Sequence, residues 1–247
     1  MNNSFLKILL IDIKSIIDFL FLKIIQIIFV SKLNNPPNIL FINTGQIGDL
    51  IISSKLLEND SLFSNFEKVY FLMQDDYIQM FEDYTGTIQL LGINVQRYKY
   101  DLIFRIKKNI ELSNLNIRIV YNLTSARPIW NDSLALGIGA EKKYCFANNW
   151  QFEQKLFANY INQFYTNKLA VGLYNEYDRI NSLVDTFSNN FKYSTISKTI
   201  VFKQYHKIES YDIIISPFSS SKIKDWDINK FKDLIYIISQ NWKVLLI

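Results

Sequence analysis

The sequence predicts an α/β fold built around a parallel sheet, and three observations support this prediction. Short runs rich in β-branched and aromatic residues occur at residues 38–43 (NILFIN), 68–73 (KVYFLM) and 117–122 (IRIVYN). The first two runs are almost continuously apolar, which is typical of strands buried on both faces of a sheet. Helical patterns follow the first and the third of these runs, at residues 49–58 and 129–136, as in the crossover connections of parallel sheets. We therefore predict a Rossmann-like arrangement.

Composition narrows the range of functions. The chain has 247 residues, of which 49% are hydrophobic and 20% charged, so it can bury a core in one or two domains. The 27 Lys and Arg residues against 23 Asp and Glu give a net charge of +4, too small an excess to indicate a nucleic-acid-binding protein. One cysteine, Cys145, and one histidine, His206, cannot supply a disulfide framework or a zinc site of four such ligands.

The first element is predicted to be an amphipathic helix over residues 5–31. At about 100° per residue, one uninterrupted face of that helix is aliphatic and aromatic. This face, called the apolar stripe below, consists of Leu6, Leu9, Leu10, Ile13, Ile16, Ile17, Leu20, Phe21, Ile24, Ile27 and Ile28. Charged residues interrupt every long apolar run, so the segment does not resemble a membrane span, and it lacks the small-residue cleavage site of a secretory signal. We expect it to be retained in a cytosolic protein.

Two interpretations of the apolar stripe are open at this stage. The stripe could be buried against the chain's own globular domain, or it could insert into the interfacial zone of a membrane. Pro36 and Pro37 end the helix under either interpretation.

A glycine-containing turn, residues 44–50 (TGQIGDL), follows the first predicted strand and opens a helix. Gly45 and Gly48 let the backbone approach a ligand, and the free N–H groups of the helix start point into a cleft. The turn lacks the third glycine of a dinucleotide fingerprint and the Gly-Lys-Ser/Thr of a P-loop, so neither NAD nor ATP hydrolysis is indicated. Asp49 lies in the first helical turn, where a carboxylate either caps N–H groups or takes part in chemistry, and the spacing leaves both roles open.

A second turn of this kind occurs far downstream, in residues 211–226 (YDIIISPFSSSKIKDW), before a helix predicted over residues 228–240. Ser219, Ser220 and Lys224 bring hydroxyls, backbone N–H groups and a positive charge to the start of that helix. Such a combination suits a diphosphate, and a polar loop without a ligand is the alternative.

These two turns together resemble glycosyltransferase family 9, the bacterial heptosyltransferases of lipopolysaccharide assembly. The resemblance rests on Ile-Gly-Asp at residues 47–49 and on the pattern Pro-x-x-Ser-x-x-x-Lys-x-Trp at residues 217–226. Three further stretches agree with the family, at residues 120–124 (VYNLT), 136–146 (LGIGAEKKYCF) and 175–183 (NEYDRINSL). The resemblance covers residues 38–247.

The resemblance implies a GT-B fold, in which two Rossmann-like domains bind the acceptor and the nucleotide-sugar donor. Residues 1–36 would then form the amphipathic helix, residues 37–205 the acceptor domain, and residues 206–247 the start of a donor-binding domain. Because the sequence stops in what corresponds to the second strand of that domain, the second domain is expected to be truncated.

The resemblance also implies roles for individual residues. Asp49 would be the general base that removes a proton from the acceptor hydroxyl, with Gly45 and Gly48 lining the cleft through their backbone. The donor diphosphate would be bound by Ser219, Ser220 and Lys224. No cofactor and no metal ion are expected.

The function implied is transfer of a heptose-like sugar from a nucleotide-sugar donor to a lipopolysaccharide-core or other lipid-linked acceptor. The reaction would take place at the cytoplasmic face of the inner membrane, with peripheral membrane contact through residues 5–31. The alternative is a truncated, catalytically inactive remnant that binds acceptor or membrane, in which case the 247-residue chain shows no transfer activity. A Rossmann-type oxidoreductase is a third alternative, opposed by the incomplete glycine pattern and by Lys224 with its serines.

The sequence departs from the family pattern at three positions. Asn122 replaces an aspartate, Phe218 replaces a glycine, and Asp227 replaces the proline that follows the tryptophan. Asp227 is predicted to cap the helix that follows rather than to bind a metal ion. Lys142 and Lys143 are expected in a solvated loop, with contact to an anionic acceptor as the alternative.

Overall fold

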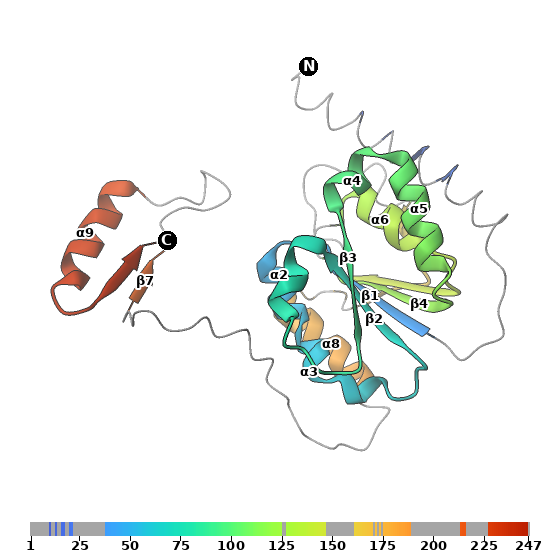
Figure 1. Ribbon diagram of the computed structural model, residues 1–247, viewed down its shortest axis with the longest axis horizontal. Helices are drawn as coiled ribbons and strands as arrows, with labels where there is room; N and C mark the ends of the chain where they lie inside the picture. Colours follow the sequence, from blue (N-terminus) through green and yellow to red (C-terminus); the bar gives the residue numbers. More distant parts are fainter. Residues whose placement is uncertain are drawn as a thin grey trace. The chain divides into compact units, whose positions relative to one another are not determined.

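Figure 1 shows the computed structural model of the chain. The structure describes residues 38–124, 127–146, 161–169, 171, 173, 175–188, 213–215 and 227–246, together with residues 10, 13, 16, 17, 20 and 21. The chain divides into two compact units, residues 1–203 and residues 204–247, each of which is described by itself.

The first unit is built on a sheet of six parallel strands. The strands are β1 (Asn38–Ile42), β2 (Val69–Gln74), β3 (Gln89–Ile93), β4 (Ile117–Asn122), β5 (Lys142–Phe146) and β6 (Asn167–Leu169). They lie in the order β3-β2-β1-β4-β5-β6, and every neighbouring pair is parallel. The predicted α/β fold with a parallel sheet is confirmed. Because β2 and β3 lie on one side of β1 and β4 lies on the other, the order of the strands reverses between β1 and β4. In open α/β sheets, ligands bind at the carboxyl ends of the strands at such a reversal.

Helices cover both faces of this sheet (Figure 1). One face packs against α4 (Val95–Tyr100), α5 (Leu102–Ser113) and α6 (Ile129–Gly137), and the other against α2 (Ile47–Ser53), α3 (Lys55–Glu58) and α8 (Glu176–Ser188). Strand β1 shows why its sequence is continuously apolar. Leu40 and Ile42 enter the core under the first group of helices, Ile39 and Phe41 enter the core under the second, and all four side chains are fully buried.

The helix predicted over residues 49–58 is two helices in the structure, α2 and α3, which meet at Ser54. Two serine hydroxyls bond to the backbone there, Ser53 Oγ to the carbonyl oxygen of Leu50 (3.0 Å) and Ser54 Oγ to that of Ile51 (2.7 Å). Serine hydroxyls that bond to the preceding turn compete with the regular helical pattern, which accounts for the break.

Six residues of the N-terminal segment are described, and each has helical backbone: Leu10, Ile13, Ile16, Ile17, Leu20 and Phe21. All of them belong to the apolar stripe, whereas the rest of the predicted helix over residues 5–31 lies outside the described residues. Among the helices that the structure describes, none has the length and apolar content that a membrane span requires.

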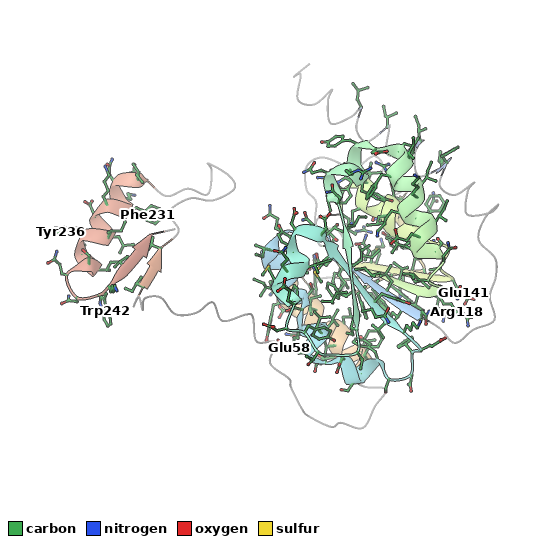
Figure 2. The ribbon with its side chains drawn as sticks, in the orientation of Figure 1. Glu58, Arg118, Glu141, Phe231, Tyr236 and Trp242 are labelled. Atoms are coloured by element: carbon green, nitrogen blue, oxygen red, sulfur yellow. The ribbon has the colours of Figure 1, made fainter. Side chains whose placement is uncertain are left out.

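The second unit contains a βαβ arrangement of β7 (Ile213–Ile215), α9 (Ile228–Ser239) and β8 (Val244–Leu246), with the two strands parallel. Asp227 caps α9 as predicted, because its Oδ1 accepts a hydrogen bond from the backbone N–H of Asn229 at 2.8 Å. Tyr236 points away from the two strands in Figure 2, and 71% of its surface is exposed.

Candidate functional site

Polar side chains gather at the carboxyl ends of β1 and β4, where the order of the strands reverses. Thr44 follows β1, and its backbone N–H donates to Thr124 Oγ1, beyond the end of β4, at 3.2 Å. Asn131, on α6, donates through Nδ2 to both hydroxyl oxygens, at 2.8 Å to Thr44 and 3.1 Å to Thr124. These three buried residues form a junction that connects the loops following β1 and β4.

Asp49 lies beside this junction, in the first turn of α2. Its carboxylate accepts no hydrogen bond from any residue that the structure describes, and α2 has no side-chain cap, with Gln46 at its N-cap position. Of the two roles that the sequence left open, helix capping is therefore not the one observed. The half-buried carboxylate is left available to a ligand.

The Asp49 carboxylate occupies space that is open because Gly45 has no side chain. A Cβ atom at Gly45 would lie 2.7 Å from Asp49 Oδ2 and 3.0 Å from Asn43 Oδ1, so a larger residue would displace the carboxylate. Gly48 is exposed and has open space where a Cβ would be. Neither glycine has a left-handed backbone conformation. Gly45 is thus required for a close approach between side chain and backbone rather than for an unusual φ angle.

Two side-chain amides hold this turn in place, and neither is among the site residues predicted from the sequence. Asn43 accepts a hydrogen bond from the N–H of Gly45 (2.9 Å) and donates to the carbonyl oxygen of Asp49 (3.1 Å) and to Ser53 Oγ (2.7 Å). Gln74, the last residue of β2, donates through Nε2 to the carbonyl oxygens of Thr44 (3.1 Å) and Gly45 (2.8 Å). Amides do stand at these places in the sequence, because Asn43 ends the first predicted strand and Gln74 directly follows the second, but nothing in the sequence shows that both contact the same turn.

A buried ion pair lies near the same edge of the sheet, between Arg127, just before α6, and Asp132, on α6. Arg127 donates to Asp132 Oδ1 at 3.2 Å, and their side chains are 1% and 6% exposed. Tyr165 also donates to Asp132 Oδ1, at 2.6 Å, and Asn122 donates to the Tyr165 oxygen at 3.0 Å. Burial raises the pKa of the Asp132 carboxyl, against the charge of Arg127 and the hydrogen bonds from Tyr165 and Asn122, which lower it. Asn122 also donates through Nδ2 to Asp132 Oδ1, at 3.4 Å.

Cys145 and Lys143, which the sequence singled out, are both buried in the structure. Burial raises the pKa of the Cys145 thiol to about 12, so this side chain is not a nucleophile at neutral pH. Lys143 is buried and donates through Nζ to the carbonyl oxygen of Leu136 at 2.8 Å, which corrects the prediction of a solvated loop for this residue. Lys142 is exposed as predicted, but it is the first residue of strand β5 and not part of a loop.

The predicted donor-binding residues Ser219, Ser220 and Lys224 lie outside the described residues, as does Phe218. His206 also lies outside them. Their assignment therefore continues to rest on the sequence resemblance.

No protein-family model and no curated protein matches this sequence. Solved structures do match. One is E. coli heptosyltransferase WaaC with ADP-2-deoxy-2-fluoro heptose, at a TM-score of 0.58 and 13% identity, covering 85% of this chain and 68% of that chain. The fold is heptosyltransferase-like. A glycosyltransferase family 9 structure from Veillonella parvula DSM 2008 has a TM-score of 0.56 at 14% identity. The match covers 88% of this chain and 63% of that chain.

A third solved structure, E. coli ADP-heptose lps heptosyltransferase II, has a TM-score of 0.51 at 10% identity, covering 85% of this chain and 63% of that chain. The chain thus spans about two thirds of the length of these three proteins, between 63% and 68%. The predicted likeness to glycosyltransferase family 9 and the GT-B fold class are confirmed at the level of the fold. The parallel sheet with helices on both faces is the part of that fold that carries the Gly45–Asp49 turn.

Proposed function

We propose that this protein is a glycosyltransferase that moves a heptose-like sugar from a nucleotide-sugar donor to a lipopolysaccharide-core or other lipid-linked acceptor. The observation that carries the proposal is the Asp49 carboxylate, free of hydrogen bonds from the described residues, at the point where the strand order reverses. A carboxylate in this place can accept the proton of an acceptor hydroxyl as that oxygen attacks the sugar. The heptosyltransferase-like fold supports the same reaction class.

The donor is proposed to be an ADP-heptose or a close analogue. One structure with this fold is described as holding ADP-2-deoxy-2-fluoro heptose. Ser219, Ser220 and Lys224 would bind the diphosphate, since hydroxyls and an ammonium group stabilise the negative charge of the leaving group.

Lys224→Ala tests this donor site. A charge-assisted hydrogen bond contributes about 1.5–3 kcal/mol, so we expect ADP-heptose to bind roughly 10- to 100-fold more weakly, measured by isothermal titration calorimetry. Lys243→Ala, at an exposed position just before β8, serves as the control and should leave donor affinity unchanged. Equal affinities for the wild type and Lys224→Ala would remove the site assignment.

We also propose that the N-terminal helix contacts the membrane that holds the lipid-linked acceptor. Within the apolar stripe, Leu10, Ile13, Ile17, Leu20 and Phe21 are between 40% and 60% exposed. Helical aliphatic side chains left in solvent favour the interfacial interpretation over burial against the chain's own domain. An anionic lipid surface is the proposed occupant, because residues 1–35 carry Lys7, Lys14, Lys23 and Lys32 against Asp12 and Asp18. A helix on the membrane would bring the site to a lipid-linked acceptor at the cytoplasmic face of the inner membrane.

Ile17→Asp is the sharpest test of this contact, because Ile17 is 60% exposed. Burying one isoleucine in the interface contributes about 1.5–3 kcal/mol, so we expect at least tenfold weaker binding to anionic phosphatidylglycerol vesicles in co-sedimentation, with the melting temperature unchanged. The control is Val171→Asp, which places the same charge at a position that is 72% exposed. A fall in melting temperature for Ile17→Asp without a change in vesicle binding would instead assign the stripe to the protein's own core.

A further inference from the structure

The turn that carries Asp49 is held by a residue that belongs neither to β1 nor to α2. Gln74 reaches across from the end of β2, and its Nε2 donates to the carbonyl oxygens of Thr44 and Gly45. The N–H of Gly45 bonds in turn to Asn43 Oδ1. Both peptide groups of Gly45 therefore have a fixed hydrogen-bond partner, and neither can rotate without losing one.

The position of Gly45 sets the position of the Asp49 carboxylate. The carboxylate lies directly over Gly45, since a Cβ there would be 2.7 Å from Oδ2. The carboxylate itself has no hydrogen-bond partner among the described residues, so packing on this turn is what locates it. A shift of the turn would be transmitted to the carboxylate.

We infer that Gln74 is a positioning residue that fixes the turn of residues 44–49 and, through it, the Asp49 carboxylate. The inference rests on the proposed function, since a fixed carboxylate matters only if it takes a proton from an acceptor. Gln74 is only partly buried, so loss of its two hydrogen bonds removes local order at small cost to the whole fold. Asn43 is almost fully buried and also bonds to α2, so its replacement would confound the two effects.

Two variants separate the hydrogen bonds of Gln74 from a change of charge. Gln74→Glu keeps the size of the side chain but replaces the donating Nε2 group with a carboxylate oxygen, which cannot donate to the two carbonyl oxygens. Gln74→Met removes the donor without adding charge. Gln79→Glu is the matched control, because Gln79 is exposed on the 3-10 helix Asp75–Phe81 that follows β2.

The readout is glycine-selective ¹⁵N labelling of the whole chain, which has only seven glycines and so gives few amide signals. In both Gln74 variants the Gly45 signal should shift and exchange with solvent roughly tenfold faster, as expected for the loss of about one net hydrogen bond. The signal of Gly86, which precedes the amino end of β3, should not change in the Gln74 variants, and the Gly45 signal should not change in the control variant Gln79→Glu. An unchanged Gly45 signal in Gln74→Met would overturn the inference. This holds even if the signal changes in Gln74→Glu, because the added charge would then explain that change.

Transfer kinetics test the link to chemistry. We expect kcat of Gln74→Met to fall by about 10- to 100-fold with KM for the donor unchanged, since a misplaced base slows the chemical step without touching the donor contacts. An unchanged kcat beside a perturbed Gly45 would overturn the positioning role. Absence of transfer by the wild type would count against the proposed function instead, and the glycine signals, which need no turnover, would still decide whether Gln74 holds the turn.

Discussion

Arg127→Met should lower the free energy of unfolding of the first unit by about 3–5 kcal/mol, the largest change in stability expected from a single replacement in this site. Arg127 and Asp132 form an ion pair whose side chains are almost fully removed from water. Removing the guanidinium leaves the carboxyl buried without its positive neighbour, whereas methionine fills much of the same volume. Urea denaturation followed by circular dichroism measures the loss.

The loss should depend on pH in a defined direction. Burial raises the pKa of the Asp132 carboxyl, and the charge of Arg127 is the largest of the effects that oppose this. An acid with a raised pKa in the folded state stabilises the fold at low pH, and this stabilisation disappears as the pH rises through the folded-state pKa. Without Arg127 that pKa rises further, so the deficit of the variant should widen as the pH rises above the ordinary range of a carboxyl group.

Arg118→Met provides the control for this prediction. Arg118 and Glu141 also form an ion pair, at 2.7 Å, but it lies at the surface of the first unit (Figure 2). Exposed pairs of this kind contribute little to stability because water and salt screen them. A loss in Arg127→Met no greater than in Arg118→Met, or one that narrows as the pH rises, would show that the buried pair is not held together as its geometry indicates.

Strands β1, β2 and β4 could be predicted from the sequence because each contains a run of five or six residues rich in β-branched and aromatic side chains. Strands β1, β2 and β4 have neighbours on both sides, and β1 and β2 are buried along nearly their whole length, which produces recognisable apolar runs. Strand β3 is an edge strand that is only partly buried, and β6 has three residues. Such short and partly solvated strands leave too weak a period to detect.

The site divides in the same way between local and distant contributions. The Gly45–Asp49 turn could be predicted because its residues are neighbours in sequence and the turn follows directly from a buried strand. The bonds of Asn131 to Thr44 and of Tyr165 to Asp132 join residues 87 and 33 positions apart. A single sequence contains no information about which polar residues meet across such distances, so the buried network and the role of Gln74 become visible only in the folded chain.

Asp49→Asn should reduce the rate of sugar transfer by about 10²- to 10⁴-fold, because asparagine keeps the size of the side chain but cannot accept the proton of the acceptor hydroxyl. Stability should hardly change. The Asp49 carboxylate accepts no hydrogen bond from the described residues, so the replacement removes no capping bond from α2. The variant also leaves Gly45 with the same packing partner, since the two side chains have nearly the same shape.

The measurement is turnover with an ADP-heptose donor and a lipid-linked acceptor, together with the melting temperature and the affinity for the donor. Asp76→Asn makes the same chemical change at an exposed position just beyond the end of β2, and it should leave turnover at the wild-type level. If Asp49 is the general base, kcat alone falls, while donor affinity and melting temperature stay constant, because binding and folding do not require the proton transfer. Normal turnover by Asp49→Asn would end the assignment, and a fall in melting temperature together with kcat would return Asp49 to a structural role at the start of α2.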